Sequence, residues 1–216
     1  MVATLSCYKG TDSKVCIPST IILNDKYLQV VEIGQSAFRD NKHLSIAILS
    51  EGIVKIDKSC FYGCSNLRSV TLPSTIRSIR ESAFNGCSHL DSFAIPDGVE
   101  RIYDSTFYDC SSLKKIMIPE SVGAIDKSAF SKCIALEEIV IPDSVEKIGD
   151  HSFYGCKSLK NVVLPSNLKF IDWNLFKGCE SLTSIQIPDS VTKIHKSAFE
   201  GCPVLNKTSK APHDSQ

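Results

Sequence analysis

Hydrophobic residues recur along this chain with a period of 23 positions. Each period contains a phenylalanine and, six positions later, a leucine; in most periods an isoleucine also follows a proline by six positions. The phenylalanines are Phe38, Phe61, Phe84, Phe107, Phe130, Phe153, Phe176 and Phe199. Because these columns stay in register without an interrupting linker, the pattern predicts one repeat domain.

The unit that spans residues 136–156 shows the pattern most clearly. It begins with L-x-x-I-x-I, whose end alternates as in a strand with one buried side. Pro142 follows, and the strand should end there because proline has no N–H to donate. Residues 145–148 predict a second short stretch along another side. The segment that ends at Gly155 is too short for a stable helix and predicts a single helical or 3₁₀ turn.

The complete unit, L-x-x-I-x-I-P-x-S-V-x-x-I-x-x-x-A-F-x-G-C, resembles the BspA-like class of leucine-rich repeat, the 23-residue type. The resemblance implies a right-handed repeat solenoid of the α/β type. A parallel β-sheet would form one face, with short strands and single helical or 3₁₀ turns on the others. One unit cannot bury its apolar face alone, whereas stacked units bury it as continuous ladders. Asp40, Asp109 and Lys132 replace the turn glycine, so these turns are expected to be either slightly strained or shaped differently.

The expected organisation has three parts. Residues 1–28 would be an N-terminal cap, residues 29–205 a solenoid of about eight 23-residue units, and residues 206–216 a polar C-terminal tail. Within the cap, residues 21–27 predict two strands joined by an Asn-Asp turn. No C-terminal cap is recognisable. The last unit is therefore expected either to be open to self-association or to continue into further chain.

Seven cysteines follow the phenylalanines by three positions: Cys64, Cys87, Cys110, Cys133, Cys156, Cys179 and Cys202. The favoured interpretation is a column of small buried thiols. Disulfides between neighbouring turns are an alternative, since stacked Cα atoms would lie within bridging distance. Metal binding is a weaker one, because ligands along a line do not converge on one point. Cys7 and Cys16 lie outside the column and are expected to be more reactive.

Charge and composition narrow the function classes. The chain carries 24 basic and 24 acidic residues, a net charge of zero, so it lacks the basic footprint of a nucleic-acid binder. No apolar run approaches the ~18 residues of a membrane span, so no membrane insertion is expected. The first residues do not resemble a signal peptide. By sequence the compartment would be cytoplasmic, whereas the family resemblance implies the cell surface or secretion.

No catalytic constellation stands out. The histidines occupy variable, outward positions, and no nucleotide-binding motif is present. We therefore expect no enzyme, no cofactor and no metal site. Trp173 breaks the local pattern and is either a contact point or a packing residue.

The candidate binding residues lie on the expected sheet face, where a mild apolar stripe has a charged rim. They are Thr71, Ala94, Lys115, Met117, Glu138, Val140, Asn161, Val163 and Gln186. The alternative is an ordinary sheet face, since valine suits β geometry. Opposite charges on adjacent strands, such as Glu137 and Lys160, should pair.

A second candidate column follows the phenylalanines and contains Tyr62, Tyr108 and Tyr154, which are either interface residues or shields of the turn. Together these features predict a non-enzymatic protein–protein interaction module. The resemblance implies a microbial surface or adhesin-type protein that binds a host or matrix protein. The alternative is an intracellular scaffold or signalling protein.

Overall fold

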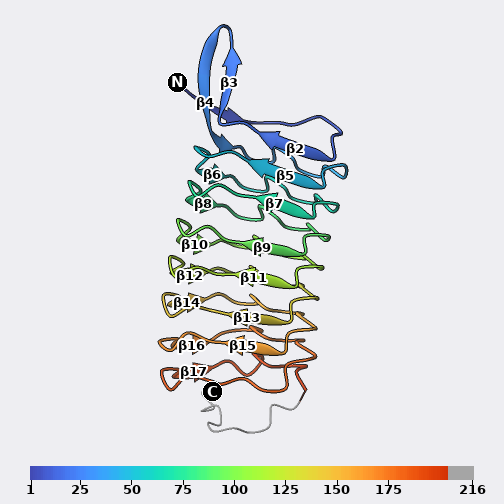
Figure 1. The fold of residues 1–216 in the computed structure, drawn as a ribbon. Coiled ribbons are helices and arrows are strands. Elements are labelled where there is room, and N and C mark those ends of the chain that lie inside the picture. Colours follow the sequence, from blue (N-terminus) through green and yellow to red (C-terminus); the bar gives the residue numbers. More distant parts are fainter. Residues whose placement is uncertain (204–216) are drawn as a thin grey trace.

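The computed structural model describes residues 1–203, which form an elongated stack of similar rungs, each of one 23-residue unit (Figure 1). Two columns of short parallel strands run along the stack. We call the first column the strand face: β2 (Lys14–Ile17), β5 (Ile46–Leu49), β7 (Ser69–Thr71), β9 (Ser92–Ala94), β11 (Lys115–Met117), β13 (Glu138–Val140) and β15 (Asn161–Val163).

The second column, here the second wall, lies on another side of the same rungs (Figure 1). Its strands are β1 (Val2–Leu5), β4 (Lys26–Ile33), β6 (Lys55–Ile56), β8 (Ser78–Ile79), β10 (Arg101–Ile102), β12 (Ala124–Ile125), β14 (Lys147–Ile148), β16 (Phe170–Ile171) and β17 (Lys193–Ile194). From β4 and β5 onward, residues paired between neighbouring rungs are 23 positions apart, as Met117 and Ala94 are. The sequence period is therefore the spatial register, and the predicted repeat solenoid with parallel strands is confirmed.

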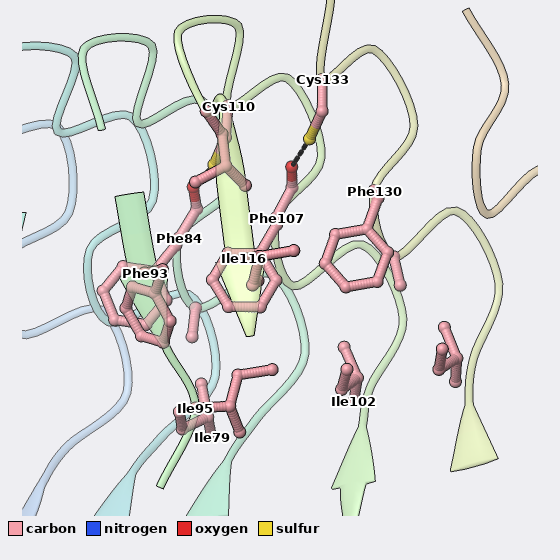
Figure 2. Close-up of a cluster of buried hydrophobic side chains, with 14 of the residues drawn as sticks. Ile79, Phe84, Phe93, Ile95, Ile102, Phe107, Cys110, Ile116, Phe130 and Cys133 are labelled. Atoms are coloured by element: carbon pink, nitrogen blue, oxygen red, sulfur yellow. Dashed lines mark hydrogen bonds between the residues drawn. The ribbon is translucent and has the colours of Figure 1, made fainter. Parts of the chain in front are cut away.

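The phenylalanine column fills the centre of the stack. Successive rings have centroids 5.0 to 5.7 Å apart and planes within 13° of parallel. Figure 2 shows Phe84, Phe107 and Phe130 in this row. Since Phe130 is fully buried and both of its faces are covered by other rings, each rung depends on its neighbours for its core.

The cysteine column lies beside the rings. All ten cysteines of the chain are free, so disulfides between neighbouring turns do not form. Each ladder thiol donates to the carbonyl oxygen of the phenylalanine 26 positions earlier, as Cys133 Sγ does to Phe107 at 3.2 Å (Figure 2). The buried-thiol interpretation is confirmed for the six thiols from Cys64 to Cys179, whereas Cys202 is partly exposed. The thiol proton has a partner in each rung from Cys64 to Cys202.

The turn around each phenylalanine differs from the expectation. Residues 1–203 contain neither an α-helix nor a 3₁₀-helix. In the rung of Phe153, His151 and Gly155 have φ values of 60° and 69°, and such left-handed residues interrupt a helix. The N–H groups of residues 151, 153 and 155 then donate to residues 173, 175 and 177 of the next rung. The N–H groups of residues 152, 154 and 156 bond within the turn, to the carbonyl oxygens three residues earlier. The predicted helix does not form, because every second N–H group bonds to the next rung and only isolated turns close by such i→i+3 bonds.

The residues that replace the turn glycine adopt the same left-handed backbone. Asp40, Asp109 and Lys132 have φ values of 57°, 55° and 62°. The strain expected at these positions is therefore present, since L-residues rarely occupy this region.

The N-terminal segment contains a rung of its own. β1 pairs with β4, β2 pairs with β5, and the ring of Tyr8 lies 5.0 Å from that of Phe38. Tyr8 and Phe38 are 30 positions apart instead of 23 because a hairpin is inserted between them. It joins β3 (Thr20–Leu23) to β4 through Asn24 and Asp25, and it rises above the end of the stack (Figure 1).

Two expectations fall on residues 204–216 and lie outside the described residues: the polar tail and the open C-terminal end. Within residues 1–203, no helix is both long enough and apolar enough to cross a membrane.

Candidate functional site

The expected binding residues lie together on the strand face. In β11, β13 and β15 the middle residue points into the core and the two flanking residues point out. Met117, Val140 and Val163 are 62%, 62% and 53% exposed. The other six, Thr71, Ala94, Lys115, Glu138, Asn161 and Gln186, are exposed as well. Period-two alternation therefore predicted correctly that all nine side chains are exposed. Their role in binding remains a prediction.

Parallel register turns these positions into a continuous surface. Met117 lies beside Ala94, and Val140 beside Val163, in paired strands. The core does not need these side chains, because Ile116, Ile139 and Val162 already fill the inner positions of the same strands. A row of apolar side chains left in water at the centre of a sheet is the kind of patch that marks an interaction surface.

Charged residues border this apolar row on the side where the strands begin. Lys160 Nζ lies 3.3 Å from Glu137 Oε2, so one of the expected pairs across adjacent strands is confirmed. Lys115 and Glu138, which lie on neighbouring strands, form no ion pair within residues 1–203. Their charges therefore remain available to a partner.

Two shallow depressions lie toward the ends of the apolar row. One, of about 510 Å³, lies around Thr71, Ala94 and Asp97, and the other, of about 590 Å³, lies around Val163, Gln186 and Asp189. Both are open to solvent, so the strand face offers an extended surface more suited to a macromolecule than to a small substrate.

The tyrosine column behaves differently from the strand face. Tyr62, Tyr108 and Tyr154 are each half-buried. The Arg39 guanidinium lies 4.1 Å from the centre of the Tyr62 ring, and Lys132 Nζ lies 5.2 Å from that of Tyr108. These contacts favour the alternative role, in which the tyrosines shield the turns.

The thiols of the ladder are poorly suited to nucleophilic chemistry. Burial raises the pKa of the Cys64 thiol to about 12 and raises the pKa values of Cys87, Cys110 and Cys133 well above the ordinary range. Protonated thiols are weak nucleophiles. Cys7 and Cys16 are exposed, and both border an apolar hollow of about 310 Å³ at the N-terminal end of the stack. Within residues 1–203 no group of three or more His, Cys, Asp or Glu side chains could hold a metal ion.

One exposed aromatic pair lies outside the predicted sites. Phe170 and Trp173, on the second wall, are 51% and 58% exposed, and the Trp173 ring stacks on His195 at 4.7 Å. The sequence could have indicated Phe170, because the equivalent positions of the neighbouring rungs are the lysines Lys147 and Lys193, as expected of an outward column. Trp173 was recognised as irregular, whereas Phe170 was not.

The fold and this surface define a leucine-rich-repeat solenoid. The chain matches the model of the BspA type leucine rich repeat region, in six copies, over residues 16–137 and 123–212. It belongs to that family. A comparison with curated proteins found no match.

Solved structures show the same architecture. A leucine-rich repeat protein from Bacteroides ovatus is 30% identical, with a TM-score of 0.66, over 87% of this chain and 43% of that one. A leucine-rich repeat protein of T. pallidum is also 30% identical, with a TM-score of 0.55, over 82% of this chain and 71% of that one. The pneumococcal vaccine antigen PcpA is 19% identical, with a TM-score of 0.58, over 93% and 72%. That last likeness concerns the fold alone.

These relationships indicate a protein-interaction module of a generally non-enzymatic repeat class. The chain spans less than half the length of the Bacteroides ovatus protein that it matches.

Proposed function

We propose that this chain is a non-enzymatic binding module of a microbial surface or adhesin-type protein, and that its strand face binds a host or matrix protein. The observation that carries the proposal is the row of exposed apolar residues, Met117, Val140 and Val163, on a face whose core positions are already filled. An aliphatic row with charged neighbours fits the apolar centre and polar rim of protein interfaces.

The structural relatives support the surface location. PcpA, which shares the fold, is described as a vaccine antigen. The long flat face also supports a macromolecular partner, because solenoids present extended surfaces to such ligands.

The test compares the purified chain with the variant Met117→Lys, Val140→Glu, Val163→Lys on immobilised extracellular-matrix proteins by biolayer interferometry. We expect the wild type to bind at least one matrix protein and the variant to bind it at least about tenfold more weakly, since charge replaces the apolar contact. Phe170→Lys is the matched control, because it introduces a lysine at an exposed apolar residue of the second wall. Equal loss in both variants, or none in the face variant, contradicts the proposed site.

A second candidate function is an intracellular scaffold. The observation that favours it is the set of ten free cysteines, which suits a reducing compartment. The same variants, offered to an extract of the source cell, separate the two candidates: a scaffold retains a strand-face-dependent partner there and binds no matrix protein.

A further inference from the structure

Charged side chains form two rows across the strand face, perpendicular to the strands. The first row consists of Arg68, Asp91, Lys114, Glu137 and Lys160. Its sign alternates from rung to rung. The second row has Lys115 and Glu138 at its centre, next to the apolar row. All of these residues are exposed, and within residues 1–203 only one ion pair joins any of them, between Glu137 and Lys160.

Such a pattern can complement a copy of itself. A two-fold axis that lies in the plane of the face, along the strands, brings two faces together and reverses the order of the rungs. Each position along a strand then faces the same position of the second copy. β11 and β13 are neighbours on the face (Figure 1), and they lie midway between the rung of β7 and that of residues 184–186. The midpoint between them is one possible position for this axis.

With the axis midway between β11 and β13, opposite charges meet at each charged position of the two rows but one. Lys115 faces Glu138 of the second copy, and Lys114 faces its Glu137. Asp91 faces Lys160 of the second copy; Arg68, the exception, faces Thr183. Every contact occurs twice, because an interface about a two-fold axis is isologous.

The same operation places the apolar row on itself. Met117 meets Val140 of the second copy, and Ala94 meets its Val163. The most exposed apolar side chains of the strand face would therefore be covered where the charges pair. Apolar contact at the centre and charged contact beside it is the usual arrangement of a specific interface.

Other positions of the axis are less favourable. An axis along β11 would set Lys114 and Lys115 opposite the same two lysines of the second copy. An axis along β13 would likewise set Glu137 and Glu138 opposite the same two glutamates. Like charges in contact oppose association. An axis between β9 and β11 leaves Lys115 opposite Ser92. The position between β11 and β13 therefore matches the largest number of opposite charges.

We propose that the strand face pairs two copies of this chain about this axis, with Lys114 and Lys115 of each copy against Glu137 and Glu138 of the other. The inference rests on the proposed function only in taking the strand face as the docking surface. The axis pairs six rungs, from β7 to residues 183–186, and five positions in each rung cover about 29 Å by 17 Å, or roughly 500 Å² for each copy. That is below the roughly 800 Å² per partner of a standard interface, so the dimer is weak and depends on concentration, with a dissociation constant on the order of 10 µM or higher.

One edge of this interface opposes pairing. Beyond the strand ends, the axis brings Glu120 opposite Asp143 of the second copy, and both are exposed carboxylates. Neutralising one of them removes a repulsion. Glu120→Gln therefore strengthens the dimer, by about two- to tenfold in its dissociation constant.

Sedimentation velocity of the full chain, from about 1 to 200 µM, tests the proposal across the expected range of dissociation constants. Variant A is Lys114→Glu with Lys115→Glu, and variant B is Glu137→Lys with Glu138→Lys. Each alone places like charges opposite one another, so its dissociation constant rises at least about tenfold. An equimolar mixture of A and B restores the opposite charges, and a heterodimer forms. The control Asp104→Lys with Lys127→Glu alters exposed charges elsewhere in the rungs and leaves the dimer unchanged.

Three results overturn the proposal: a wild-type chain that stays monomeric throughout, variants that dimerise as the wild type does, or a mixture of A and B that remains monomeric. If the wild-type chain stays monomeric, its binding to matrix proteins is still measured separately and the proposed function can stand. If the wild-type chain dimerises but binds no matrix protein, that result contradicts the proposed function and not the dimer.

Discussion

The interior columns and the strand face obey different rules although they share the same rungs. The phenylalanine column keeps one residue type in every rung from Phe38 to Phe199. The outward column changes from Thr71 to Ala94, Met117 and Val140 over four rungs. A buried side chain packs against its own equivalents above and below, so one shape must repeat. An outward side chain also lies beside its equivalents, but one side of it faces water, so its shape need not repeat and its variation can encode a partner.

The largest expected effect comes from the interior. Phe130→Ala should lower the free energy of unfolding by about 3–5 kcal/mol, because it empties a fully buried layer between Phe107 and Phe153. Chemical denaturation followed by circular dichroism measures the loss. Tyr8→Ala is the control: Tyr8 is half-buried and contacts one ring of the column, so the loss should be less than half as large. A loss below about 1 kcal/mol for Phe130→Ala would show that the column does not carry the fold.

An intermediate loss of stability is expected from substitutions in the turns around the phenylalanines. Gly155 has a φ of 69°, so Gly155→Ala should cost about 1–2 kcal/mol, the penalty of an L-residue in the left-handed region. Lys132 has a φ of 62° at the equivalent position of the preceding rung. Lys132→Gly relieves that strain but adds entropy to the unfolded chain, so the net change should stay within about 0.5 kcal/mol. Equal losses in both variants would show that backbone strain is not the cause.

The regular part of this fold could be predicted because each buried column repeats one residue type. The columns of Phe130 and Cys133 predicted the rungs and their burial, and alternation around Ile139 predicted which side chains face outward. The helix expected before Gly155 does not form, because His151 and Gly155 have a left-handed backbone and every second N–H group of the segment bonds to the next rung. No local sequence pattern shows those bonds.

The N-terminal rung was missed for a related reason. Tyr8 replaces phenylalanine, and the inserted hairpin shifts its spacing, so the period does not reach it. That rung is recognised by its contacts with the next rung, whereas a sequence pattern describes one rung at a time.

The smallest effect is expected at the strand face, where adjacent residues allow a matched comparison. Val140 is 62% exposed and Ile139 is 2% exposed, in the same strand. Val140→Thr keeps a β-branched side chain in water, so the free energy of unfolding should change by no more than about 0.5 kcal/mol. Ile139→Thr places a hydroxyl in the core and removes packed carbon, so it should cost at least about 2 kcal/mol. Denaturation midpoints of the two variants measure the contrast. A loss at Val140→Thr as large as that at Ile139→Thr would mean that the outward row supports the fold, and its apolar character would then no longer point to a partner.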